Sequence, residues 1–391
     1  MSKLEELLKE FCPNGVEYIS VEELLKEKTI SSITPSLKIK RNDYKDFGEI
    51  PIISQEEEYI SGYCNIFDKK IIDGQYVCFG DHTENVKYVD FRFVQGADGL
   101  KIICCNNKEK IDIKYFYYAV CNFYKRHNNY ERHYKYFVEL QIPLPALPVQ
   151  REIVRILDSF TLYSAELTAE LTARRKQYEF YRDKLLNFNT SIEETTIGDI
   201  ALVTKLAGFE FTNYVKYSDF GNVIALRGLN VKNGKLDLTD IKYIDGSDFS
   251  KLNRSKLQIG DMLFTYVGTI GQVALIEEDD KYYLAPNVAL IRLKRKDIMP
   301  KYIRYYFQSN AFFSTQILRL LQSSSMQNIP MEKIRKFVVK IPPMEVQERI
   351  VKVLDNFDAI CSDLGIGLPA EIEKRQKQYE YYRDKLLSFQ N

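Results

Sequence analysis

The chain has 391 residues and 45% of them are hydrophobic, which excludes an intrinsically disordered protein and predicts two or three domains. Lys and Arg number 55 and Asp and Glu number 54, which excludes the uniformly basic surface that phosphate binding favours. The 7 cysteines lack the spacing of a disulfide framework, and neither a signal peptide nor an apolar membrane span is expected, so we expect a cytoplasmic protein with reduced thiols.

The first segment, residues 1–144, is expected to be a globular α+β domain. Lys101–Cys104 has the apolar pattern of a strand, and Tyr115–Tyr124 has the pattern of a helix. A loop that mixes cations, amides and an aromatic residue follows, from Lys125 to His133. The cations of such a loop can bind phosphates and its amides can bind base edges, although a solvated loop explains the same residues equally well.

A second basic cluster lies nearer the N-terminus of this segment. Together with the loop it defines the residues that we predict to contact DNA in the first half of the chain. These residues are Lys38, Lys40, Arg41, Lys125, Arg126, Asn128, Asn129 and Arg132.

Residues 145–190 are expected to form a helical region behind a proline-rich entry. Apolar residues recur there at intervals of three and four, which is typical of a heptad seam between two helices packed lengthwise. The long helix is predicted from about Ala165 to Phe188. The predicted interface residues are Leu167, Leu171, Tyr178, Tyr181, Leu185 and Phe188.

The second globular segment, residues 191–341, is also expected to be α+β, with a strand at Val288–Leu293 and a helix at Lys301–Phe313. Polar residues at the ends of its elements can contact DNA, because Gln and Asn suit adenine and Arg suits guanine. The same residue types are also common in ordinary turns. The predicted DNA-binding residues are Arg227, Lys232, Gln322, Ser324, Gln327 and Asn328.

Residues 342–391 are expected to form a second helical region. A glycine- and proline-containing stretch around residues 365–369 is expected to interrupt it. The predicted interface residues after the interruption are Tyr379, Tyr382, Leu386 and Phe389.

The two helical regions are copies of one another. Residues 144–154 recur at 341–351, and residues 176–186 recur almost unchanged at 377–387. The globular segments match more weakly, for example at Phe47–Ile53 and Phe220–Leu226. A repeat of this length predicts a pseudo-twofold α+β protein with two globular domains and two long helices packed as an antiparallel coiled coil.

The sequence contains little that indicates a catalytic site or a metal-binding site. The only Pro-Pro pair, Pro342-Pro343, opens a helix, and no phosphate-binding loop is present. The three histidines, His82, His127 and His133, lack the spacing of a zinc site. We therefore predict no catalytic residue, no metal and no cofactor on this chain.

The duplicated order of variable domain and shared helix, with the Lys-Gln-Tyr-x-x-Tyr-Arg-Asp-Lys-Leu-Leu ending at Lys176–Leu186 and Lys377–Leu387, resembles the specificity subunit of type I restriction-modification systems. The resemblance covers essentially the whole chain. It implies a non-catalytic subunit whose two target-recognition domains each read one half of a bipartite site in double-stranded DNA.

The resemblance further implies partners: two methyltransferase subunits that carry S-adenosylmethionine and, when present, restriction subunits that use ATP and Mg²⁺. Two alternatives are a stand-alone coiled-coil scaffold and the specificity subunit of a related methyltransferase or nuclease system. DNA binding that ignores sequence would favour the scaffold.

Overall fold

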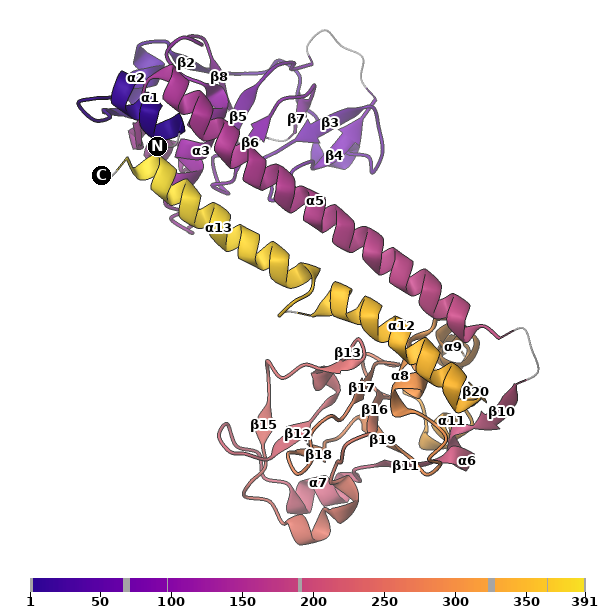
Figure 1. The fold of residues 1–391 in the computed structure, drawn as a ribbon. Coiled ribbons are helices and arrows are strands. Elements are labelled where there is room, and N and C mark those ends of the chain that lie inside the picture. Colours follow the sequence, from indigo (N-terminus) through magenta and orange to yellow (C-terminus); the bar gives the residue numbers. More distant parts are fainter. Residues whose placement is uncertain are drawn as a thin grey trace. The chain divides into compact units, whose positions relative to one another are not determined.

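The computed structural model describes residues 3–65, 71–96, 98–188, 192–322, 328–363 and 365–389. Figure 1 shows the ribbon. The chain divides into two compact units. Unit 1 consists of Met1–Thr168 and Glu371–Asn391, and unit 2 consists of Ala169–Ala370. Each unit therefore combines a globular domain with parts of both helical regions.

Unit 1 contains a four-stranded antiparallel main sheet, a three-stranded small sheet and a two-stranded pair. The main sheet has the order β2 (Ile30–Ile33), β8 (Leu100–Cys105), β5 (Tyr76–Gly80), β6 (Val86–Val89). The small sheet has the order β4 (Gly62–Cys64), β3 (Ile50–Ile53), β7 (Val94–Gln95), and β1 (Tyr18–Ser20) pairs with β9 (Gln141–Pro143). The short helices are α1 (Lys3–Phe11), α2 (Val21–Lys26), η1 (Arg41–Asp43), α3 (Ile113–Phe123) and α4 (Tyr134–Glu139).

Unit 2 repeats this plan and adds one further pair of strands. Its main sheet has the order β11 (Ala201–Lys205), β19 (Val288–Leu293), β16 (Met262–Thr265), β17 (Val273–Leu275). Its small sheet has the order β15 (Lys242–Tyr243), β12 (Ile224–Leu226), β18 (Tyr282–Leu284), and the pairs are β10 (Glu193–Thr196) with β20 (Val338–Ile341) and β13 (Val231–Lys232) with β14 (Lys235–Leu236). In both small sheets the central strand has one antiparallel and one parallel neighbour.

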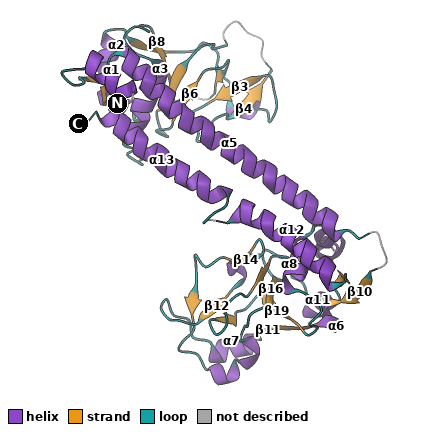
Figure 2. Cartoon of the chain, in the orientation of Figure 1, coloured by secondary structure: helices purple, strands orange, loops and turns teal. Residues whose placement is uncertain are grey.

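The helices in the globular part of unit 2 are short, and Figure 2 shows them beside the orange strands. They are α6 (Ile197–Ile200), α7 (Gly208–Tyr214), η2 (Gly228–Asn230), η3 (Phe249–Lys251), η4 (Asn253–Ser255), α8 (Pro300–Gln308), α9 (Asn310–Phe312), the π-helical η5 (Phe313–Ile317), α10 (Leu318–Gln322) and α11 (Met331–Arg335). The helix predicted at 301–313 therefore breaks near Ser309, whose hydroxyl caps α9 by accepting a hydrogen bond from Phe312 N.

The long helices are α5 (Leu147–Leu186), α12 (Met344–Ser362) and α13 (Leu368–Ser388). The expectation that the first long helix starts near Ala165 was wrong, because α5 runs unbroken for 40 residues from the proline-rich entry. Proline is compatible with the first turn of a helix, where its missing N–H has no intrahelical partner. The predicted interruption of the second helical region is confirmed between α12 and α13.

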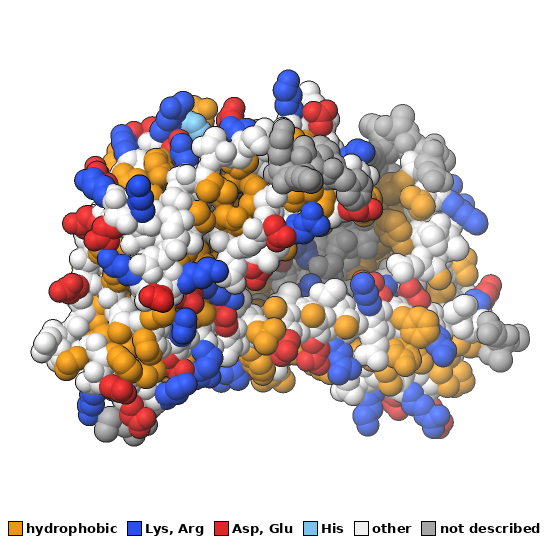
Figure 3. All heavy atoms as spheres, turned by 90° about the horizontal axis from the view of Figure 1, so that it is seen from above, with side chains coloured by type: hydrophobic (Ala, Val, Ile, Leu, Met, Phe, Trp, Pro, Cys, Tyr) orange, Lys and Arg blue, Asp and Glu red, His pale blue; other side chains and the backbone are white. Residues whose placement is uncertain are grey.

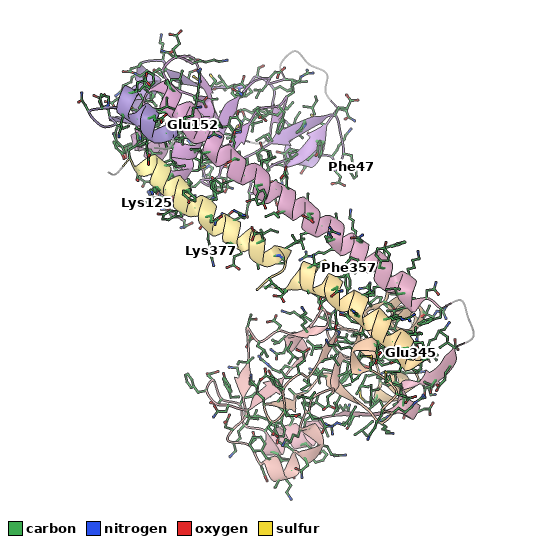
Figure 4. All side chains as sticks on the ribbon, in the orientation of Figure 1. Phe47, Lys125, Glu152, Glu345, Phe357 and Lys377 are labelled. Carbon is green, nitrogen blue, oxygen red and sulfur yellow. The ribbon has the colours of Figure 1, made fainter. Side chains whose placement is uncertain are left out.

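Within each unit, part of α5 packs antiparallel against a helix of the second copy. In unit 1, Phe160 of α5 stacks on Tyr382 of α13, with ring centroids 5.4 Å apart. In unit 2, Phe357 of α12 stacks on Tyr181 of α5 at 5.6 Å, and Figure 4 shows Phe357 on α12. Since these residues correspond in the sequence repeat, the α+β fold with an antiparallel coiled coil and internal pseudosymmetry is confirmed.

The predicted interface residues have two kinds of surroundings. Leu167 and Leu171 are 7% and 9% exposed within the helical stretch of α5. The residues toward the helix ends pack instead against the core of a globular domain. These residues are Tyr178, Leu185 and Phe188 in unit 2, and Tyr379, Leu386 and Phe389 in unit 1.

A buried glutamine anchors a long helix to the globular domain in each unit. Gln347 donates hydrogen bonds to Asp297 O and Pro342 O and accepts one from Met299 N, all at 2.9 Å. Gln150 makes the corresponding bonds in unit 1, and both side chains are 0% exposed. The shared Gln of the helical entry is therefore structural, since it satisfies backbone groups that burial would leave unpaired. No helix in the described parts of the chain is long and apolar enough to cross a membrane.

Candidate DNA interface

Each unit carries a cleft at the same end of its main sheet. Both clefts lie between the turn after β5 or β16 and the segment that leads into β8 or β19. Cleft 1, of about 330 Å³, is lined by Ser32, Ile33, Thr34, Pro35, Lys38, Asp81, His82, Gln95, Asp98, Gly99, Leu100, Lys101 and Arg132. Cleft 2, of about 490 Å³, is lined by Phe211, Tyr217, Arg227, Gly228, Leu229, Val267, Gly268, Thr269, Pro286 and Asn287.

Only some of the DNA-binding residues predicted in the first half of the chain lie at cleft 1. Lys38 and Arg132 line cleft 1 although 94 positions separate them in the sequence (132 − 38). Lys38 is paired with Asp98 at 2.6 Å, and Arg41 is paired with Glu56 at 3.1 Å. Lys40 lies between these two cations, directly before η1, and is exposed.

The loop between α3 and α4 is held by one buried carboxylate from the turn after β5. Glu84, which is 3% exposed, accepts hydrogen bonds from the backbone N–H groups of His127 and Asn128 and from the Tyr124 hydroxyl. The His127 ring lies 3.0 Å away through Nδ1. Since an ionised carboxylate can only accept, His127 Nδ1 carries the hydrogen.

The electrostatics of Glu84 follow from these contacts. Burial by itself would raise the pKa of its carboxyl, but the hydrogen bonds from His127, Asn128 and Tyr124 outweigh burial and lower the pKa to about 2. Glu84 therefore stays charged and fixes the backbone of the loop that carries the predicted contacts.

The remaining predicted residues of this loop make local contacts. Arg126 donates to Asn85 Oδ1 at 2.9 Å, and Asn129 Oδ1 lies 2.8 Å from His133 Nε2. The side chain of Asn129 is thus engaged within the loop, whereas Lys125 and Arg132 are exposed. Asn128 has a positive φ of 54°, a conformation that Asn tolerates better than most residues.

Glu84, His127 and His133 are the one group of this kind in the described residues that could hold a metal ion, with ligand atoms within 4.8 Å of one another. Carboxylate and imidazole are suitable zinc ligands. Each of these groups also makes the hydrogen bonds described above, and His133 Nδ1 lies 3.1 Å from Asp81 O. Hydrogen bonding thus accounts for the cluster, and the expectation that this chain holds no metal stays a prediction.

In unit 2 the predicted residues also separate into two sets. Arg227 lines cleft 2, and Asn328 forms a β-bridge with Val267 of the same cleft. Lys232 lies instead in the β13–β14 hairpin, where it pairs with Asp237 at 2.5 Å. Gln322 ends α10, while Ser324 and Gln327 lie outside the described residues.

Sequence reasoning missed several surface and cleft residues. Phe47 and Phe220 occupy matching positions and are 87% and 86% exposed, and Figure 4 shows Phe47 beside the β3–β4 strands. Tyr130, which is 94% exposed, stacks on His82 with centroids 5.6 Å apart. The Phe-Gly pair that recurs in both globular segments was a signal for Phe47 and Phe220. Only the exposed fractions in the structure show that these two rings face the solvent.

Charge is distributed as the composition predicts. Lys and Arg side chains are interspersed with Asp and Glu on the face that Figure 3 presents. Many cations of the described residues also have an acidic partner, as Lys38, Arg41 and Lys232 do. Positive charge is therefore interspersed with negative charge rather than gathered into one broad basic surface on this face.

The fold and the two clefts define a class of protein. The chain is internally duplicated, and each copy combines long helices with a globular domain whose cleft is similar to, but not identical with, that of the other copy. A family model described as the type I restriction modification DNA specificity domain matches residues 20–174 and 189–374. The chain therefore belongs to the specificity subunits of type I restriction-modification systems.

Individual relatives agree with this family. The specificity subunit of the type I restriction enzyme EcoR124I/EcoR124II of Escherichia coli is 30% identical over 410 residues, covering 100% of this chain and 97% of the relative. A putative type I specificity subunit of Haemophilus influenzae is 28% identical, covering 88% of this chain and 89% of the relative. The crystal structure of the S subunit from M. genitalium has the same fold, with a TM-score of 0.58, 11% identity and coverage of 96% of this chain and 97% of that chain.

Proposed function

We propose that this chain reads a bipartite DNA site and holds methyltransferase subunits over it. The observation that carries the proposal is the repetition of one fold with two different clefts. Buried contacts such as those of Gln150 and Gln347 are the same in both units, whereas the cleft linings differ. Two different linings on one repeated frame suit a protein that reads two different half-sites.

The proposed DNA contacts centre on the two clefts. Lys38 and Arg132 would bind phosphates beside cleft 1, with Lys40, Arg41, Lys125 and Arg126 as further cations of unit 1. Arg227 and Asn328 would contact the other half-site at cleft 2. Two modest modules joined by a stiff connection bind more tightly than either alone, because the second contact is intramolecular.

The long helices would act as a ruler for the spacer between the half-sites. α5 runs for 40 residues and contributes to both units. Inserting four residues near Leu171 adds about one helical turn, so the recognised spacer should change while both half-sites stay the same. An unchanged spacer in a folded variant contradicts the ruler.

The chemistry would lie on partners. We propose that the chain is non-catalytic and acts in the cytoplasm with two methyltransferase subunits that bind S-adenosylmethionine, and with restriction subunits that use ATP and Mg²⁺ where a system has them. One similar solved structure, at a TM-score of 0.58 and 14% identity, is described as part of a study of complex assembly of the type I R-M system, which supports such partners.

Methylation mapping tests the proposal directly. The chain is co-expressed with its methyltransferase partner in a host that lacks modification, and modified adenines are read across the genome. We expect a single split motif with methyladenine in each half. Replacing residues 191–340 with the corresponding domain of a relative should change one half-site only. A change in both halves, or methylation without a motif, contradicts the assignment.

A further inference from the structure

In each cleft, one lining residue has a buried side-chain polar atom without a hydrogen-bond partner. In the described residues, only four buried side-chain polar atoms lack a partner, and they belong to Gln95, Arg227, Arg304 and Gln308. Gln95 lines cleft 1 and Arg227 lines cleft 2. Buried polar groups are nearly always paired, so an unpaired one at the corresponding cleft of both units needs an explanation.

In unit 1 the unpaired atom is the carboxamide oxygen of Gln95. The side chain is 2% exposed, and its Nε2 donates a long hydrogen bond of 3.4 Å to Leu100 O. Oε1 has no partner among the residues that the structure describes. This oxygen is an acceptor held at the wall of a cleft whose other lining residues include three cations, Lys38, Lys101 and Arg132.

The fold itself does not require this glutamine. Gln95 is the last residue of β7, and it lies opposite Ile53 in the parallel pairing of β3 with β7. In unit 2 the corresponding pair is Leu226 and Leu284, and Leu284 is 2% exposed. An apolar side chain therefore fills the same place in the second copy, and the carboxamide costs stability that the architecture could avoid.

In unit 2 the unpaired atom belongs to Arg227, which directly follows β12. Its Nη2 donates to both Asp240 O and Asp240 Oδ1 at 2.8 Å, and its Nε has no partner in the described part of the chain. The corresponding residue of unit 1 is Ser54, whose hydroxyl is 2.7 Å from that of Ser61. The two clefts therefore differ in hydrogen-bonding sense, with an acceptor at Gln95 and a donor at Arg227.

We propose that Gln95 and Arg227 determine specificity, each by hydrogen-bonding a base edge of one half-site. Gln95 Oε1 accepts from an exocyclic amino group, the N6 of adenine or the N4 of cytosine. Arg227 donates to the O6 and N7 acceptors of guanine. This proposal rests on the proposed function, since it names the groups with which each unit reads its half-site.

The test uses the full chain with its methyltransferase partner and genome-wide mapping of methyladenine. Gln95→Leu installs the residue type that unit 2 carries, and Gln95→Met is a second variant of nearly the same length. Either should reduce discrimination about tenfold or more at one position of one half-site and leave the other half unchanged. Arg227→Lys keeps the charge but loses the forked donor geometry, and it should relax one position of the other half-site.

Gln308→Leu is the matched control, because it removes the same kind of unpaired oxygen at a residue that lines neither cleft. It should leave the motif unchanged. Variants that assemble, methylate and keep the parental motif at every position overturn the proposal while the proposed function stands. A parental chain that yields no split motif refutes the proposed function itself, which separates the two failures.

Discussion

Replacing the buried Glu84 should loosen the loop between α3 and α4 without touching that loop's own sequence. In Glu84→Gln, one carboxylate oxygen becomes an amide NH₂ group. If the amide takes the place of Oε2, a donor faces the N–H groups of Asn128 and His127, which now donate to that oxygen at 3.0 Å. If it takes the place of Oε1, it faces the Tyr124 hydroxyl and the His127 ring instead. The first orientation leaves those two N–H groups facing a donor, and the second requires the Tyr124 hydroxyl and the His127 ring to accept rather than donate, so either orientation loses the charged acceptor that holds the loop.

The size of the effect follows from the pKa of the carboxyl. A fall from the ordinary value of 4.5 to about 2 corresponds to about 3 kcal/mol of stabilisation of the charged form. Solvent around the neighbouring exposed loop screens part of this, which leaves on the order of 2 kcal/mol. For a unit of this size such a loss lowers the unfolding midpoint by about 4–8 °C.

The pH dependence has a definite sign. Because folding depresses the pKa of Glu84, its contribution is complete above the unfolded value of 4.5 and is lost as the pH falls toward about 2. Thermal unfolding of the parent and of Glu84→Gln should therefore differ at pH 7, and the difference should shrink as the pH falls from 4.5 toward about 2. Glu57→Gln, at an exposed position of the same unit, serves as the control. Equal midpoints at pH 7, or a difference that persists undiminished at pH 3, would refute the reasoning.

Three further predictions concern the helix junctions. Gln347→Leu removes three buried hydrogen bonds and should destabilise unit 2 by about 2–4 kcal/mol in urea unfolding; a smaller loss than that of a surface Gln→Leu variant contradicts the anchoring role. Burial raises the pKa of Asp355, but hydrogen bonds from Tyr305 and Lys301 give a net lowering, so Asp355→Asn should destabilise at pH 7 and progressively less below pH 4 in pH-resolved thermal scans. Phe160→Ala removes the stack on Tyr382 and should cost about 1–2 kcal/mol, seen as faster amide exchange in α13.

The order of domains and helices could be predicted from the chain alone because the repeat is written in local patterns. Three patterns of short stretches carried the prediction: the proline-rich entries, the apolar residues spaced three and four apart, and the break that contains glycine and proline. The structure has a helix end or a helix at each of these places. The start of α5 was misplaced, because the stripe of apolar residues was followed back only to Leu167, whereas α5 begins at Leu147 and its first turn accepts Pro148.

The candidate sites could be predicted only in part. Lys38, Arg132 and Arg227 were singled out by residue type and do line the clefts, but Lys232 has the same chemistry and lies elsewhere. Gln95 gave no signal, since a glutamine near a strand end is unremarkable until its burial and its unpaired oxygen are known.

The sequence by itself determined the duplication, the helical frame and the family, because these depend on periodicity and on motifs that neighbouring residues share. Only the tertiary structure decided that α13 completes unit 1, that Glu84 holds a loop more than 40 positions further along the chain, and that matching clefts place an acceptor in one unit and a donor in the other. These features arise from contacts between distant segments, and such contacts depend on how whole elements pack rather than on the preferences of any one stretch.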